Sequence, residues 1–324
     1  HSEVQFDNVL RPDGGLDEIP SMVPSLPEGQ LTAENQPIPP YFGANQQEQQ
    51  FLDEVTRAFS KGKVTPQRRS GPINQGYSAS YGDQFQVFGD TPLGLVTGVT
   101  YSRSTSASRD RRSAAAGAGG GAGVSTEFRL TGESGSTEEV LGGIANFTLN
   151  PHPNHQLSFN TLYNRSEQKS AVFLSGRIPR DDDSRTFNRR RIEPIDRTVW
   201  NLQAKGEHML GSGGSSTPRL TWSSSYSQTT QDESDVRFFT DDFLPERNVH
   251  RIALSVYEAP TRYFRNLKES TWSNDLSVSV PFGPGSVEVG GSYLRKERDL
   301  EERRFVYGNL DSPNYEGAPD TYFG

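Results

Sequence analysis

The sequence predicts an all-β protein, an antiparallel up-and-down transmembrane β-barrel or partial barrel with about eight strands. First, apolar and polar residues alternate over stretches of roughly nine to eleven residues, the length that a tilted strand needs to cross a bilayer. Second, tight turns join these stretches in pairs, and segments of roughly 30–40 residues separate the pairs, like the short periplasmic turns and long extracellular loops of such barrels. Third, aromatic residues gather near both ends of the stretches, like the girdles at the two membrane interfaces.

The composition is lean for a soluble protein of this size. Of the 324 residues, 31% are hydrophobic and 32 are glycine, whereas soluble domains usually reach about 45–50% with glycine included. A barrel with a polar interior does not need a thick apolar core. The chain has no cysteine, which excludes a disulfide scaffold and a thiolate metal site. Its net charge of −8 argues against a nucleic-acid partner.

The pattern divides the chain into three regions. Residues 1–73 are expected to form a partial strand (2–10) and a long Pro-rich loop with a short amphipathic helix at 46–59. Residues 74–305 are the β-barrel segment, and residues 306–324 are a loop-like tail.

The first hairpin, residues 76–103, has the clearest alternation. One face carries Tyr77, Ala79, Tyr81, Phe85, Val87, Leu93, Leu95, Val99 and Tyr101. The positions between them are mostly Ser, Thr, Gly and Gln, and the turn is expected at Gly89–Pro92. A period of two residues indicates strands with one apolar face, which contacts either a protein core or lipid.

Three further hairpins follow the same plan. They cover residues 139–166, 199–228 and 270–296, with turns at 150–154, 211–216 and 282–285. The segments between hairpins, 104–135, 167–190 and 229–268, are expected to be long loops. The first of these contains the run Ala114–Gly123, which offers almost no side chain to pack and is expected to be mobile.

The aromatic residues of the hairpins fall into two groups. On the long-loop side lie Tyr77, Tyr101, Tyr163, Trp200, Tyr226, Trp272 and Tyr293, and on the short-turn side lie Phe85, Phe147, Phe159, Trp222 and Phe282. A soluble antiparallel sandwich also alternates, but its turns come about every 8–12 residues at both ends. The asymmetry between short turns and long segments therefore favours a barrel in a membrane.

Candidate catalytic and metal-binding residues are few. His152 and His155 share a turn and could form a metal pair, but without a third ligand nearby a solvated turn is the favoured interpretation. Asp181–Asp183 and Asp232–Asp242 could bind Ca²⁺, but they lack the spaced D-x-D-x-D-G register, which favours solvated charge runs. Gly117–Gly123 lacks the following GK[ST] of a phosphate loop. The sequence therefore predicts no enzyme, no catalytic residue, no cofactor and no metal site.

Several segments, in order along the chain, resemble the barrel of TonB-dependent outer-membrane receptors. They are GYSASYGDQFQVFG, PLGLVTGVTYSRS, STEEVLGGIANFTLNPHPNHQLSFNTLYNRSEQ, QDESDVRFFTDDF and GGSYLRKERDLEERRF. The resemblance covers roughly residues 71–305 and implies a larger barrel of about 22 strands around an N-terminal plug. The chain contains no recognisable plug or energy-coupling box and starts at His1 without an initiator Met. We therefore expect a fragment that covers the early barrel.

The resemblance implies import of a scarce ligand across the outer membrane of a Gram-negative bacterium. The implied partners are outer-membrane lipid, the receptor's own plug, the TonB energy-coupling protein and a small ligand that the sequence does not identify. Two alternatives remain: a small non-transporting outer-membrane barrel with a structural or adhesive role, and a soluble β-rich binding module. An upstream plug would separate the first two, and detergent-dependent folding would separate both from the third.

Five charged residues lie on the predicted inward face: Lys205, Glu207, Asp275, Glu288 and Lys296. In a receptor of this family they could contact the plug or the ligand path. The alternative, which a polar barrel interior favours, is that they pair with each other and hold the wall together.

Overall fold

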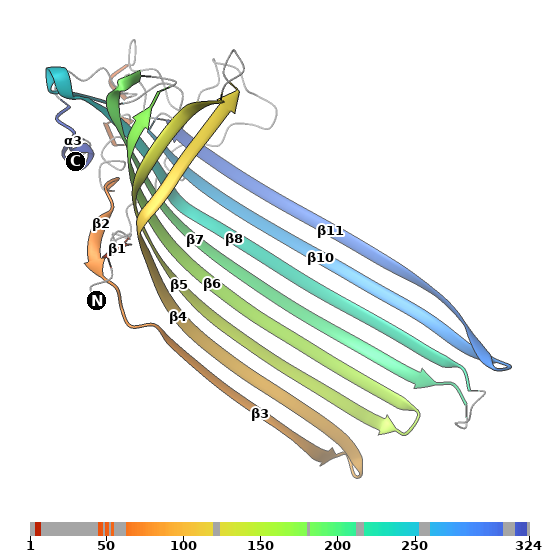
Figure 1. The fold of residues 1–324 in the computed structure, drawn as a ribbon. Coiled ribbons are helices and arrows are strands. Elements are labelled where there is room, and N and C mark those ends of the chain that lie inside the picture. The colour runs from red at the N-terminus through yellow and green to blue at the C-terminus, as the bar shows by residue number, and fades with distance from the viewer. Residues whose placement is uncertain are drawn as a thin grey trace.

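The computed structural model describes residues 4–7, 45–47, 49–51, 53–54, 63–118, 124–179, 182–211, 217–252, 260–306 and 315–322. Within them the chain is all-β, as predicted, and eight long strands form one antiparallel up-and-down sheet in the order β3-β4-β5-β6-β7-β8-β10-β11 (Figure 1). The strands are β3 (Gln75–Val87), β4 (Thr91–Ala118), β5 (Val124–His152), β6 (His155–Ile178), β7 (Asp182–Met209), β8 (Arg219–Leu244), β10 (Thr261–Phe282) and β11 (Gly285–Val306).

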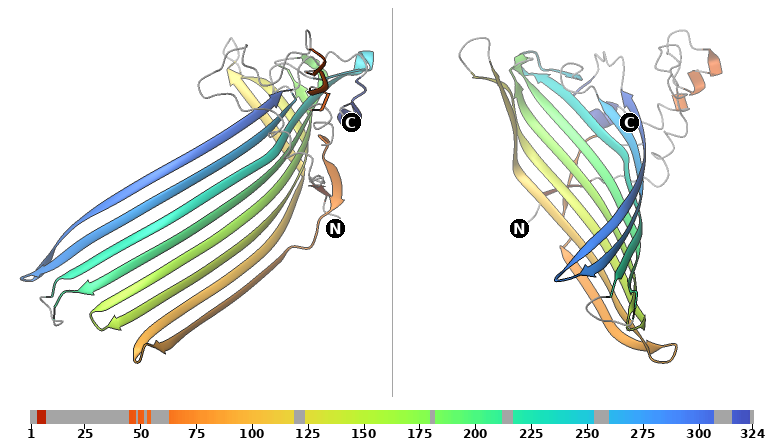
Figure 2. Two further views of the ribbon diagram at one scale, coloured as in Figure 1. Left: turned by 180° about the vertical axis from the view of Figure 1, so that it is seen from behind. Right: turned by 90° about the vertical axis from the view of Figure 1, so that its right-hand side faces the viewer.

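The sheet is open within the described residues. β3 lies at one edge and β11 at the other, and a short strand, β9 (Val249–Ile252), pairs with β8 beside this path. The two views of Figure 2 show the long strands side by side in a single twisted sheet. The up-and-down antiparallel part of the predicted fold is therefore confirmed.

Cross-strand pairing places the apolar positions of neighbouring strands on one face. Leu95 of β4 lies opposite Phe147 of β5, which lies opposite Phe159 of β6. On the other face Lys205 of β7 lies opposite Ser223 of β8, which lies opposite Asp275 of β10. We call these the apolar face and the polar face, and their alternation is as the sequence predicted.

Three tight turns lie at the same end of the sheet, which we call the turn end; the opposite end is the far end. The turns are at residues 88–90, 153–154 and 283–284, and the β7–β8 turn falls partly in residues 212–216, outside the described residues. The first turn comes earlier than predicted: Val87 pairs with Thr91, which leaves a three-residue loop in which Phe88 and Gly89 both adopt positive φ (52° and 91°). Pro92 consequently lies inside β4.

The prediction of long loops between the hairpins is wrong. β4 continues through Ala118, β5 already begins at Val124, and only residues 180–181 separate the described parts of the next pair, β6 and β7. β8 likewise extends to Leu244, followed by the 3₁₀ turn η2 (Pro245–Arg247). These extensions pair as antiparallel ladders interrupted by β-bulges, and the ladder hydrogen bonds satisfy the backbone whatever the side chains. Their apolar residues are few and interrupted by charged residues, so no sustained alternation marks the extensions in the sequence.

The terminal regions also differ in part. β1 (Val4–Asp7) is a strand, as expected, but it pairs with β2 (Gln67–Ser70) in a separate two-stranded sheet. Those residues of 46–54 that are described are helical, in agreement with the predicted helix. β11 ends at Val306, one residue beyond the boundary expected at 305, and the described part of the tail holds a short helix, α3 (Pro319–Tyr322).

The buried hydrophobic residues gather at the far end. One cluster joins Val64, Phe239, Ile252 and Tyr315, and a second joins Leu130, Leu174, Ile178 and Phe187. The first cluster brings a segment that precedes β3 and a segment that follows β11 together over β8. At the turn end, by contrast, the large apolar side chains are exposed.

Candidate functional surfaces

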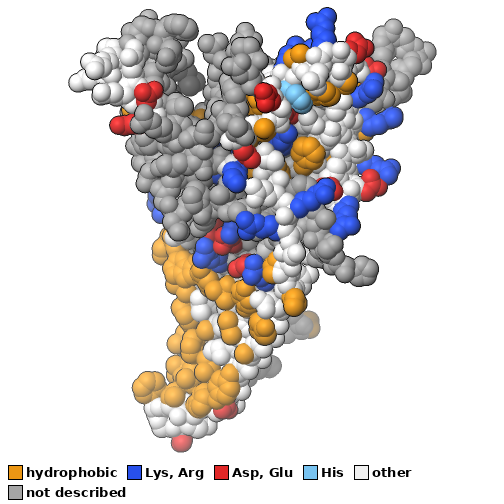
Figure 3. Space-filling view, turned by 90° about the vertical axis from the view of Figure 1, so that its left-hand side faces the viewer, with side chains coloured by type: hydrophobic (Ala, Val, Ile, Leu, Met, Phe, Trp, Pro, Cys, Tyr) orange, Lys and Arg blue, Asp and Glu red, His pale blue; other side chains and the backbone are white. Residues whose placement is uncertain are grey.

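The apolar face is solvent-exposed over the half of the sheet nearest the turn end. Trp272 is 50% exposed, Leu276 54% and Val289 70%. Figure 3 shows hydrophobic side chains gathered over the lower part of the sheet, with charged side chains above them. Soluble monomers rarely leave so wide an apolar patch uncovered. This surface, which we call the apolar band, needs an apolar neighbour.

The upper border of the apolar band is a belt of aromatic rings from seven of the strands. Tyr77 stacks with Tyr101 at a centroid distance of 6.4 Å. Trp200 and Trp272 both contact Tyr226, at 5.4 Å and 5.1 Å. Five rings of the predicted long-loop girdle therefore contact rings on neighbouring strands.

The belt crosses the sheet obliquely. Tyr163 and Trp200 lie in the cross-strand row of Ala79, Tyr226 and Trp272 in the row of Tyr81, and Tyr293 in the row of Asp83. From β3 to β11 the belt thus moves from Tyr77 to the level of Asp83, six residues toward the turn end. At ~3.4 Å per residue and ~4.8 Å per strand spacing, this is a slope of roughly 31° against the cross-strand direction.

The height of the apolar band follows from the same register. On β4 it extends from Tyr101 to Leu93, and on β10 from Trp272 to Phe282. After multiplication by the cosine of this slope, these eight and ten residues span roughly 23–29 Å. The apolar belt of outer-membrane barrels is about 25 Å tall.

The histidines of the turn end form a hydrogen-bonded chain. Nδ1 of His155 lies 3.1 Å from Nδ1 of His208, and the Trp222 indole N–H donates to Nε2 of His208 at 3.0 Å. Because indole only donates, Nε2 of His208 is the acceptor. Nδ1 of His208 therefore carries the proton and donates the hydrogen bond to Nδ1 of His155. Gly206 makes room for this arrangement, since a Cβ there would overlap the Trp222 ring.

This chain bears on the possible metal pair. His152 and His155 have ring centroids 5.6 Å apart, and Nδ1 of His152 accepts a hydrogen bond from the Asn154 backbone N–H. The sequence reasoning missed His208, which only the β6–β7 register brings to His155. Among the described residues, no group of three or more His, Cys, Asp or Glu side chains is arranged to hold a metal.

The five charged residues predicted to point inward all lie on the polar face. Those that form ion pairs do so with residues outside this set of five. Nζ of Lys296 lies 2.7 Å from Glu269, and Glu207 lies 3.2 Å from Arg219. Asp275 accepts a hydrogen bond from Ser223 at 3.1 Å. Register places Lys205 opposite serines and Glu288 opposite Ser279. Ion pairs do link strands on this face, although the pairs are not those expected within the set.

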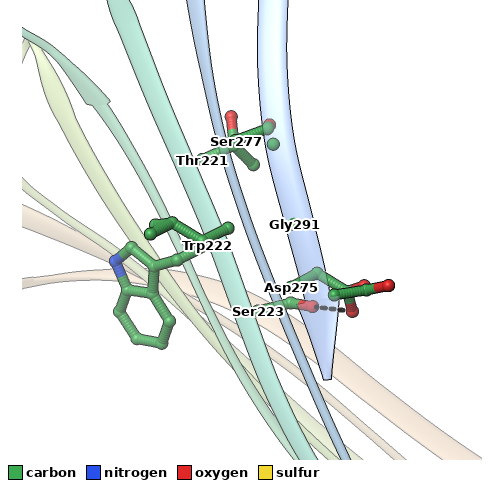
Figure 4. Close-up of a pocket in the computed structure, with 9 residues that line it drawn as sticks. Thr221, Trp222, Ser223, Asp275, Ser277 and Gly291 are labelled. Carbon is green, nitrogen blue, oxygen red and sulfur yellow. Dashed lines mark hydrogen bonds between the residues drawn. The ribbon is translucent and has the colours of Figure 1, made fainter. Parts of the chain in front are cut away.

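A shallow depression of about 340 Å³ lies where β8, β10 and β11 present small side chains (Figure 4). Its lining includes Ser223, Asp275, Ser277 and Gly290. A Cβ at Gly290 would lie 2.8 Å from the Leu276 carbonyl oxygen, so this glycine permits the close approach of two strands. The depression is too open to enclose a ligand by itself.

The far end of the apolar face holds a buried charge network. Asp235 has a positive φ of 73° at a β-bulge and accepts hydrogen bonds from the guanidinium groups of Arg237 and Arg262. All three side chains are almost completely buried. Arg190 lies 2.9 Å from Asp241, which also accepts a hydrogen bond from the Tyr315 hydroxyl. Burial and the nearby Asp241 carboxylate raise the pKa of Tyr315 well above its usual range.

The network corrects the interpretation of Asp232–Asp242 as a solvated charge run. Asp235, Asp241 and Asp242 are 3% exposed or less, and each pairs with arginine. Apart from Arg237, which is on β8 like Asp235, these partners come from other strands, which no local motif could reveal. Of the other acidic run, Asp181 lies outside the described residues. Hydrogen bonds from Ser184, followed by Arg185, lower the pKa of the exposed Asp182 carboxyl.

Two flanking segments meet over this network. The backbone N–H groups of Val64 and Thr65 donate to Asp320 at 2.7 Å and 3.2 Å, and Arg237 donates to the Lys63 carbonyl oxygen at 2.5 Å. The chain before β3 and the chain after β11 are therefore tied to each other and to β8.

The chain was compared with protein-family models, with curated proteins and with solved structures, and none of the three matches it. Within the described residues no helix has both the length and the apolar character needed to cross a membrane.

Proposed function

We propose that this chain forms part of the wall of an outer-membrane receptor that imports a scarce ligand, with lipid against its apolar band. The observation that carries the proposal is the oblique aromatic belt at the border of an exposed apolar face. Its slope of roughly 31° is close to the 35–45° tilt of strands in outer-membrane barrels. If the strands tilt by this angle, the belt lies at one constant depth.

In a soluble sheet, nothing favours the placement of aromatic rings at one depth across tilted strands. In a sandwich, inner-face residues pack against a second sheet at about 10 Å, and their exposure falls. Here the corresponding residues remain exposed, among them Tyr77, Leu276 and Val289. Lipid satisfies such a surface without further protein.

The proposal requires both edges of the sheet to be paired in the membrane. An unpaired strand in hydrocarbon leaves N–H and C=O groups without partners, each at a cost of several kcal/mol. β3 and β11 must therefore pair either with each other or with further strands.

The receptor role rests on the far end and on the resemblance described above. β4, β5 and β7 have 28 or 29 residues each, far more than the roughly nine to eleven that a crossing needs. The sheet thus extends well beyond the membrane and offers a rigid, polar surface to the outside. Energy coupling and import rest on the resemblance of residues 71–305 to TonB-dependent receptors.

A matched pair of arginine substitutions tests the membrane assignment. Leu202 lies on the apolar face of β7, level with Tyr226, and Gln203 is its neighbour on the polar face. We expect Leu202→Arg to destabilise the chain folded in phospholipid vesicles by about 2–4 kcal/mol and Gln203→Arg to have a much smaller effect. Denaturant titration measures both. Heat-dependent gel mobility reports whether folding requires detergent or lipid, and equal penalties, or folding without either, would overturn the proposal.

A further inference from the structure

A row of arginine and aromatic side chains crosses four strands on the polar face at the far end. The Arg191 guanidinium lies 5.6 Å from the Phe238 ring, Phe238 and Tyr263 meet edge-on at 5.7 Å, and the Arg304 guanidinium lies 5.1 Å from the Tyr263 ring. Alternation places Arg191 on the same face as Lys205, and Arg304 on the same face as Lys296. We call these four residues the arginine–aromatic row.

The row has cationic groups that the protein leaves available. Among the described residues Arg304 forms no ion pair, and the same is true of Arg189, one position further along the polar face of β7. Two nearby carboxylates already have other partners: Glu302 forms an ion pair with Arg265 at 2.6 Å, and Glu193 forms one with Arg191. A guanidinium stacked on an aromatic ring keeps its edge N–H donors free for a carboxylate. This part of the face therefore suits an anion, although the chain as a whole carries a charge of −8.

Spacing selects the kind of anion. Arg191 and Arg304 stand on strands three spacings apart, about 14 Å. A compact anion cannot reach both, whereas an extended molecule with an acid group toward each end can. Between the arginines lie the half-buried rings of Phe238 and Tyr263, which suit the C–H faces of sugar rings.

Resting on the proposed function, which places this face inside the receptor and open to the outside, we propose that the arginine–aromatic row binds an acidic oligosaccharide. Carboxylates of the sugar acids pair with Arg304 at one end and with Arg189 or Arg191 at the other. The sugar rings between them lie against Phe238 and Tyr263.

The test measures binding of a uronic-acid trisaccharide to the full chain in lipid vesicles by calorimetry. We expect Arg304→Gln to weaken binding about tenfold or more, since hydrogen bonds to charged groups contribute about 1.5–3 kcal/mol. Arg303→Gln is the matched control, because Arg303 lies next to it on the opposite face and pairs with Glu301 at 2.9 Å. We expect it to bind as the unchanged chain does.

A second substitution and two other ligands make the outcome decisive. Tyr263→Ala should weaken binding as well, and a neutral trisaccharide of equal length should not bind. Binding should also weaken as salt rises. Equal binding of neutral and acidic sugars, a short dicarboxylate that binds as well as the trisaccharide, or no binding by chain correctly inserted in vesicles would overturn this inference. Failure of the chain to insert at all would instead overturn the proposed function.

Discussion

Asp235 holds two buried guanidinium groups from a backbone conformation that most residues avoid. Its φ of 73° lies in the left-handed region, and its carboxylate binds Arg237 and Arg262. Arg262 is 0% exposed and Arg237 2%. Removing the carboxylate would leave two desolvated cations with only partial compensation, the situation in which a buried ion pair is most costly to break.

The substitution Asp235→Asn isolates this charge, because asparagine tolerates positive φ and has nearly the same shape. We expect a loss of about 3–5 kcal/mol in the free energy of unfolding. Urea titration followed by circular dichroism measures it. Asp183→Asn, an exposed carboxylate at the start of β7, serves as the control and should change stability by less than about 0.5 kcal/mol. A similar small change for both would show that the arginines find other partners.

Some residue pairs of the folded chain could not be predicted from the sequence. His155 and His208, or Asp235 and Arg262, are brought together only by strand register. Neither pair has a local signature, so the sequence indicated an isolated turn histidine pair and a solvated acidic run. A search for charged residues at equal distances from the aromatic belt on adjacent strands would have suggested such pairs.

At the level of elements, the β10–β11 hairpin is held beyond the aromatic belt by a carboxylate with two cations. Glu269 accepts from Nζ of Lys296 at 2.7 Å and from Nε of Arg298 at 2.7 Å. The hydrogen bond from Lys296, followed by that from Arg298, lowers the pKa of Glu269 below its ordinary value of 4.5. A lowered pKa means that the folded state favours the ionised form. Its contribution is therefore complete above pH 4.5 and is lost as the pH falls through the lower folded pKa.

Glu269→Gln should accordingly remove part of the acid sensitivity of this hairpin. We expect the unchanged chain to lose more stability than Glu269→Gln between pH 5 and pH 3, roughly the range over which a glutamate titrates. Amide hydrogen exchange of residues in β10 and β11 resolves the effect locally. Glu288→Gln is the control, since Glu288 shares the polar face but forms no ion pair among the described residues. Identical acid profiles for all three chains would contradict the assignment.

The four hairpins were predictable because each has an apolar face, whereas the extensions of the same strands were not. Between Tyr77 and Val87 the alternation of apolar and polar residues, with a period of two, is visible in the sequence. In β4 after Arg103, by contrast, Ser, Arg and Ala follow one another without such alternation, and the composition is typical of a loop. Pairing with the neighbouring strand decides the structure there, and register is a non-local property. The far-end network on β8 escaped prediction for the same reason.

At the level of the whole molecule, tilt is the property that separates a membrane wall from a flat soluble sheet. Ala79 on β3 and Glu297 on β11 lie in one cross-strand row. The belt passes two residues to the far-end side of Ala79, at Tyr77, and four residues to the turn-end side of Glu297, at Tyr293. If the belt marks the membrane surface, these two positions of one row differ in depth by roughly 17 Å.

The absence of cysteine lets single-cysteine variants report this depth without background labelling. A fluorophore at Ala79→Cys should be quenched by nitroxide lipids and shielded from iodide, because the proposed membrane placement puts this position against acyl chains just inside the belt. The same fluorophore at Glu297→Cys should be quenched by iodide and little affected by nitroxide lipids. Ser80→Cys, next to Ala79 on the polar face, should escape lipid quenching at the same depth and so separates depth from facing. Equal lipid quenching at positions 79 and 297 would mean that the strands stand upright, and the oblique belt would then lose its meaning as a membrane boundary.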